Sequence, residues 1–70
     1  MPYANNEELP ESVKLHLPPH AQDIYREAFN HAFARYRGGD EARAHRIAWA
    51  AVKRSYEKLG EQWVSRDRDW

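Results

Sequence analysis

The amino-acid sequence predicts a mainly α-helical domain: a compact unit of three helices, with a small two-stranded sheet formed by the N- and C-terminal segments. Prolines and glycines divide the chain into separate stretches, and apolar residues recur at steps of three and four within them. Residues that favour strands gather near the C-terminal end. The 70 residues are 41% apolar and 13% aromatic, which suits one small core. We expect residues 1–65 to form a single domain and residues 66–70 a flexible tail.

The first predicted helix covers residues 10–17. Pro10 suits the first turn of a helix, where its missing N–H costs nothing, and Glu11 complements the positive end of the helix dipole. Pro18 ends the helix. Val13 and Leu17, four residues apart, are expected to face inward.

The second predicted helix runs from Pro19 to Arg37 and has the strongest periodicity in the chain. Its inward stripe consists of residues spaced by three and four: Ala21, Ile24, Tyr25, Ala28, Phe29, Ala32, Phe33 and Tyr36. Gly38 can adopt the left-handed conformation that often follows a helix. The second helix is therefore expected to end beside the Gly38-Gly39 connection.

The third predicted helix begins after Asp40, a good N-cap, and runs from about Glu41 to Leu59, with Gly60 as its stop. The short glycine connection predicts that this helix lies antiparallel to the second one, with aromatic rings filling the gaps between small alanines. The two helices are expected to supply most of the core: Ile24, Tyr25, Phe29, Phe33, Ile47, Trp49, Val52 and Tyr56.

Two short segments have extended character. Gln62–Ser65 contains Trp63 and Val64, which favour strands, and Pro2–Ala4 is the only comparable stretch elsewhere. Pairing of these segments would produce a terminal β-ribbon. The alternative, that both ends are frayed, has equal support from composition.

Composition argues against several classes of protein. The chain has no cysteine, so a disulfide scaffold or a thiolate metal site or nucleophile is impossible. A chain of this length has little room for an enclosed substrate chamber, and Ser12, Ser55 and Ser65 have no adjacent base at an obvious spacing. We therefore expect a protein without enzymatic activity and without a cofactor.

A row of possible metal donors lies along the second helix. His20, Asp23, Glu27 and His31 are three or four residues apart and would share one helical face. Structural zinc needs about four ligands that converge from different directions, usually from more than one element. A solvated polar face is the better interpretation, and no metal site is expected.

The formal net charge is zero, but it is unevenly distributed. Residues 1–34 carry two basic and five acidic side chains, for a net charge of −3, and residues 35–70 carry nine basic and six acidic side chains, for +3. Arg43, Arg46, Lys53 and Arg54 project near one face of the third helix, which makes them the candidate partner-binding residues. Glu57 is expected on the same face and would weaken its charge.

Two further features leave alternatives open. A pair of helices joined by a glycine turn superficially resembles a helix-turn-helix, which would give the basic face a role in binding DNA phosphates. Trp63 and Trp70 would suit partner-binding anchors, because tryptophan is energetically potent at interfaces. The alternatives are that Trp63 covers the core and that Trp70 belongs to a disordered tail.

The location of the protein can also be anticipated. The first eight residues lack the basic and then apolar order of a signal peptide. No stretch approaches the roughly 18 apolar residues of a membrane span. We expect a soluble, cytoplasmic protein that is not itself embedded in a membrane.

Several runs of residues resemble the ChaB family: Leu9–Lys14, Leu17-Pro18, His20–Tyr25, Glu27–Asn30 and Ala48–Lys53. The resemblance extends over about residues 1–64. It implies a fold of three helices and a small sheet, and a role as an accessory regulator of a cation/proton antiporter that exchanges calcium or sodium for protons. Related domains in other proteins are suspected of contacting DNA.

Residues and resemblance together predict a non-enzymatic regulatory and binding module. The expected partner is the cytoplasmic face of a membrane cation/proton antiporter, reached through the four basic residues of the third helix. The alternative is a small DNA-associated domain that binds phosphates with the same face.

Overall fold

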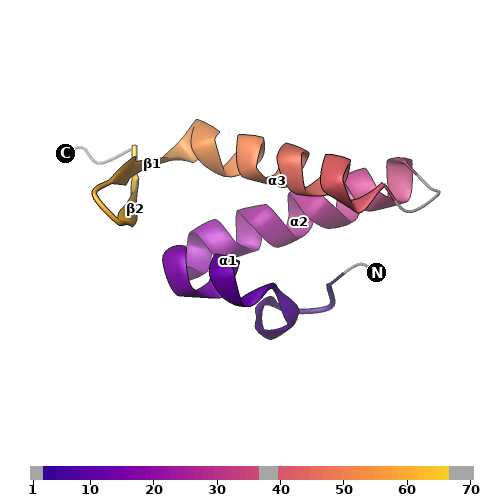
Figure 1. Ribbon diagram of the computed structural model, residues 1–70, viewed down its shortest axis with the longest axis horizontal. Coiled ribbons are helices and arrows are strands. Elements are labelled where there is room, and N and C mark those ends of the chain that lie inside the picture. Colours follow the sequence, from indigo (N-terminus) through magenta and orange to yellow (C-terminus); the bar gives the residue numbers. More distant parts are fainter. Residues whose placement is uncertain (1–2, 37–39, 67–70) are drawn as a thin grey trace.

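The computed structural model describes residues 3–36 and 40–66, and its elements follow one another in a simple order (Figure 1). A short 3₁₀ turn, η1, is followed by three α-helices and a β-hairpin: η1 Asn6–Glu8, α1 Glu11–His16, α2 Pro19–Arg35, α3 Glu41–Ser55, β1 Tyr56–Leu59 and β2 Gln62–Ser65. Pro2, the Gly38-Gly39 connection and Trp70 lie outside the described residues, as does most of the expected tail.

The boundaries of the first two helices agree with the prediction to within two residues. The carbonyl of Pro10 accepts from the backbone N–H groups of Val13 and Lys14, both at 3.0 Å, and so opens α1. Pro19 is the first residue of α2. The side-chain amide of Gln22 donates to the carbonyl of Leu17 at 2.8 Å, which joins the end of α1 to the start of α2.

The start of α3 confirms the predicted cap, but its end does not match the prediction. Oδ1 of Asp40 accepts from the backbone N–H of Arg43 at 3.1 Å. The helix ends at Ser55 rather than at Leu59, because the chain turns into β1 at Tyr56. Arg66 stabilises this ending: its Nε donates to the carbonyls of Lys53 at 2.8 Å and Tyr56 at 3.1 Å. Basic groups are favourable beside these terminal carbonyls.

The predicted two-stranded sheet is present, but the prediction that Gln62–Ser65 pairs with the N-terminal segment is wrong. β1 pairs with β2 in antiparallel register, with Tyr56 opposite Ser65 and Lys58 opposite Trp63. The turn between them contains Gly60 at a φ of 64°, a conformation that glycine adopts without a steric cost. Tyr3 and Ala4, the described residues of the predicted N-terminal strand, take no part in this sheet. Tyr3 instead contacts α2, where its ring lies 4.8 Å from that of Phe29.

The core lies between α2 and α3 and extends beneath α1. Figure 1 shows α2 and α3 side by side and antiparallel, with α1 against α2 and the hairpin at the far end of α3. Of the predicted core residues, Tyr25, Phe29, Val52 and Tyr56 are buried, and Ile24, Phe33, Ile47 and Trp49 are partly buried against them. Val13 and Leu17 of α1 are also buried, as predicted. The shared core therefore fixes the positions of α2 and α3, and with them the positions of the side chains on their surface.

Candidate partner-binding surface

The four predicted contact residues are all exposed on α3, but they divide between two flanks of the helix. Arg43 and Arg54 lie toward α2, and Lys53 lies toward the hairpin. Arg46 is exposed on the same helix. Among the described residues, no ion pair engages Arg46, Lys53 or Arg54. These cations are therefore available to an outside partner.

Glu57 does not reduce the charge of this surface. The sequence placed it on the face of α3 with the cations, but it lies on β1, and its carboxylate is 3.6 Å from the guanidinium of Arg66. Within α3 itself, Glu41 is the only carboxylate, and it lies in the first turn. The exposed face of α3 is therefore more positive than the sequence predicted.

Arg43 is held by an aromatic ring from the end of α2. Its guanidinium carbon lies 4.4 Å from the centroid of the Tyr36 ring, within the range of a cation–π interaction. The guanidinium of Arg35 also approaches this ring, at 5.9 Å. One tyrosine thus positions two positive charges where α2 ends and α3 begins.

Lys53 lies beside a pair of indole rings. Trp49 of α3 and Trp63 of β2 have ring centroids 5.6 Å apart, which places the hairpin against α3. Both rings line a hollow of about 280 Å³ together with Lys53, Lys58 and residues of α1. Trp63 therefore covers the core, as one of the two sequence interpretations proposed, and it is only partly buried.

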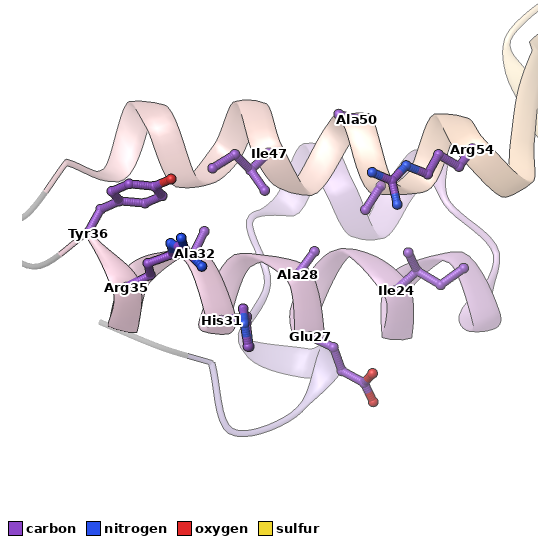
Figure 2. Close-up of a pocket in the computed structure, with 11 residues that line it drawn as sticks. Ile24, Glu27, Ala28, His31, Ala32, Arg35, Tyr36, Ile47, Ala50 and Arg54 are labelled. Carbon is purple, nitrogen blue, oxygen red and sulfur yellow. The ribbon is translucent and has the colours of Figure 1, made fainter.

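A second hollow is a groove between α2 and α3, with a volume of about 720 Å³. Its floor is made of small and branched apolar side chains, and its edges are polar. Figure 2 shows α2 along one side and α3 along the other, with α1 behind the pair. The residues that line it are Ile24, Glu27, Ala28, His31, Ala32, Arg35, Tyr36, Ile47, Ala50, Ala51 and Arg54.

Arg54 also borders a third, more polar hollow of about 450 Å³. This hollow lies where the start of α2 meets the end of α3, and His20, Ser55 and Arg66 contribute to its wall. The Nε of Arg66 is already engaged by the carbonyls that it caps. Arg54 is thus the cation shared by two neighbouring depressions.

One polar contact in the interior was missed by the sequence analysis. The hydroxyl of Tyr25 hydrogen-bonds with Nδ1 of His45, and the hydroxyl is the donor in the tautomer that has no proton on Nδ1. Burial is the larger cause, and the electrostatic effect of the nearby Tyr3 the smaller one, that raises the pKa of Tyr25 to about 12. A signal was present, because His45, Trp49 and Val52 share the spacing of an inward stripe. This pair joins α2 to α3 and is not part of the exposed surface.

Asp23, one of the possible metal donors on α2, has other polar partners. Asp23 accepts from the side-chain amide of Asn6 at 2.7 Å and lies 3.7 Å from the guanidinium of Arg26. Over residues 3–36 and 40–66, no three histidine or acidic side chains come together in a way that could hold a metal ion. Asp23 therefore has a structural role, in fastening η1 to α2.

The likeness to a helix-turn-helix does not extend to the geometry. In that motif two helices meet at about 90–120°. Here α2 and α3 run alongside each other for most of their lengths (Figure 1).

Across the part of the chain that the structure describes, no helix combines the length and apolar character needed to cross a membrane.

Comparison with known proteins identifies the family. The ChaB family model matches residues 9–66. Proteins named "Putative cation transport regulator ChaB" from Escherichia coli strain K12 and from Shigella flexneri are each 52% identical over 66 positions, covering 83% of this chain and 87% of the relative.

The fold agrees with a solved structure of the same kind. An NMR solution structure of the putative cation transport regulator ChaB superposes with a TM-score of 0.82 and 47% sequence identity, covering 94% of this chain and 100% of that one. Three helices followed by a small antiparallel sheet are thus shared with a relative of known structure. The chain belongs to the ChaB family.

Proposed function

We propose that this protein is a non-enzymatic module that regulates a cation/proton antiporter by binding an acidic cytoplasmic segment of that transporter. The observation that carries the proposal is the surface of α3, where Arg43, Arg46, Lys53 and Arg54 are all exposed on one rigid helix. Opposite charges on two partners speed their encounter and favour the correct orientation.

The names of the relatives support a role in cation transport, since they are called cation transport regulators. The family resemblance implies an antiporter that exchanges calcium or sodium for protons. A regulator of such a transporter needs a contact surface and has no need of a substrate chamber. Acidic segments between the transporter's helices are the natural counterpart of a positive surface.

The proposal is tested by recovery of the antiporter from membranes. The purified protein is immobilised and incubated with detergent-solubilised membranes that contain the transporter, and bound transporter is quantified. Arg46→Glu and Lys53→Glu should each reduce recovery several-fold, because each replaces an attraction with a repulsion. Lys14→Glu on α1 changes the charge equally away from α3 and serves as the control, with circular dichroism to verify its fold, because the Lys14 ammonium donates to the carbonyl of Glu7 at 3.0 Å. Recovery that is equal for all variants would refute the role of this surface.

The same variants distinguish the DNA-binding alternative. About four phosphate contacts would give weak binding that falls steeply with salt. Fluorescence anisotropy with a labelled duplex at low and at physiological salt measures this dependence. Salt-sensitive binding that is lost in Arg46→Glu, without recovery of any transporter, would favour the DNA-associated domain.

A further inference from the structure

The groove between α2 and α3 is long enough to receive a helix. From Ile24 to Arg35 it follows α2 for about three turns, a length of about 16 Å at the usual rise per residue. Three alanines on its floor, Ala28, Ala32 and Ala51, would allow another backbone to approach closely. The length of the groove therefore matches a partner helix of about three turns.

The groove lies on the side of the helix pair that the other described residues, within 3–36 and 40–66, leave uncovered. α1 packs on the opposite side, behind the pair in Figure 2. Ile24 and Ile47 are only partly buried, and in Figure 2 Ile47 points from α3 toward α2. A further helix over these side chains would complete their burial and extend the helix pair into a larger bundle.

The edges of the groove determine the charge of its occupant. Arg35 lies at one end and Arg54 at the other, and no ion pair among the described residues engages either of them. The carboxylate of Glu27 points away from α3 in Figure 2. An occupant with carboxylates near both ends would meet a cation at each end.

We propose that this groove receives an amphipathic helix of the partner, with its apolar face on the alanine floor and acidic residues directed at Arg35 and Arg54. This inference rests on the proposed function and specifies the form of the acidic segment. Arg54 links the two, because it belongs both to the basic surface of α3 and to the edge of the groove. Binding therefore combines burial of apolar surface with two charge pairs.

The test uses a synthetic amphipathic peptide of about 14 residues, with leucines at helical spacing on one face and glutamates beside them. Its affinity for the full chain is measured by calorimetry, its helix content by circular dichroism, and its site by amide resonance shifts. One control peptide has serine in place of leucine, and a second has lysine in place of glutamate. Both controls should bind at least about ten-fold more weakly.

Substitutions in the protein locate the site. Ala28→Glu places a bulky negative side chain on the floor and should weaken binding at least about ten-fold, and Ala28→Gln tests the effect of bulk alone. Ala34→Glu is the matched control, because Ala34 is exposed on α2 outside the groove lining. Circular dichroism of each variant shows whether the fold is kept. Arg54→Ala alters no core residue and tests the charge pair at this end of the groove separately. It should weaken binding several-fold.

The outcomes separate the groove from the proposed function. The helix-binding groove would be overturned if the peptide bound the parent and Ala28→Glu equally, or did not bind the parent at all. It would also be overturned if the resonance shifts were confined to the Trp49 and Trp63 side, or if the peptide changed the self-association of the protein. An antiporter that binds Ala28→Glu as well as the parent would also overturn it and leave the proposed function intact. A groove that binds the peptide while no antiporter is recovered would instead refute the proposed function.

Discussion

The side chain of Asn30 pairs with the backbone of Tyr3 through two reciprocal hydrogen bonds. The backbone N–H of Tyr3 donates to Oδ1 of Asn30 at 2.8 Å, and Nδ2 of Asn30 donates to the carbonyl of Tyr3 at 2.8 Å. The amide side chain thus satisfies both backbone groups of Tyr3, as a neighbouring strand would. This explains how Tyr3 is held against α2 without a strand as its partner.

The first prediction concerns this pairing. Asn30→Ala removes both hydrogen bonds, each worth about 1 kcal/mol, and should lower the free energy of unfolding by about 1 to 3 kcal/mol. Urea unfolding monitored by circular dichroism measures the change. Tyr3→Ala is the comparison variant: it keeps the backbone groups that Asn30 contacts but removes the tyrosine ring that lies against Phe29. If Asn30→Ala unfolds like the parent, this pairing does not stabilise the N-terminal segment.

The second prediction concerns the inward face of α2. Phe29 has no exposed surface, and its ring contacts those of Tyr3, Phe33 and His45. Phe29→Ala should cost about 3 to 5 kcal/mol, a large share of the stability of so small a domain. Leu15, which is 72% exposed, is the matched control, and Leu15→Ala should change stability by less than about 0.5 kcal/mol. Thermal melts of the two variants test both expectations.

The success of the helix predictions has a clear physical origin. Pro10, Pro19 and Asp40 mark helix starts through local chemistry, and the spacing of residues such as Tyr25 and Phe29 marks the inward face. These signals act within a few residues of each other. The sequence therefore contains them without any knowledge of the tertiary fold.

The end of α3 depends on contacts that sequence spacing does not reveal. Val52, Tyr56 and Leu59 continue a helical pattern, yet Leu59 lies on a strand and is 52% exposed. Contact between Trp63 and Trp49 and the capping of α3 by Arg66 favour the hairpin instead. The reciprocal bonds between Tyr3 and Asn30, 27 residues apart, are equally invisible in the sequence.

The candidate site could be predicted only in part. All four basic residues are exposed on α3, as the sequence indicated. Their division between two flanks, and the groove that Arg54 borders, follow from how α2 and α3 pack. Helical spacing gives the angle of each side chain around one axis, but it does not give the position of a second helix.

The third prediction concerns alkaline pH. A tyrosine in the unfolded chain loses its proton near pH 10, whereas the pKa of Tyr25 in the folded protein is about 12. The resulting stabilisation is complete below about pH 10 and is lost as the pH rises toward about 12. Urea unfolding over this range should show the loss. In Tyr25→Phe the decline should be shallower, and an identical decline in parent and variant would show that another group causes it.

The fourth prediction concerns the attachment of the hairpin. Trp63→Ala removes the ring that contacts Trp49 and should destabilise the hairpin by at least about 1 kcal/mol. The near-ultraviolet circular dichroism of the indole pair should weaken, while the far-ultraviolet helical signal stays close to that of the parent. Leu59→Ala alters an exposed strand residue and is the control. If the near-ultraviolet spectrum is unchanged, the two rings are not in contact in solution.

The direct passage from α3 into β1 has a mechanical consequence. Ser55 is the last residue of the helix and Tyr56 the first of the strand, and the Tyr56 side chain is buried, so no slack segment separates the two elements. The hairpin is joined to the helix without a linker and is also held against it by the contact between Trp63 and Trp49. A displacement of the hairpin is therefore passed directly to the last turn of α3, which carries Lys53 and Arg54.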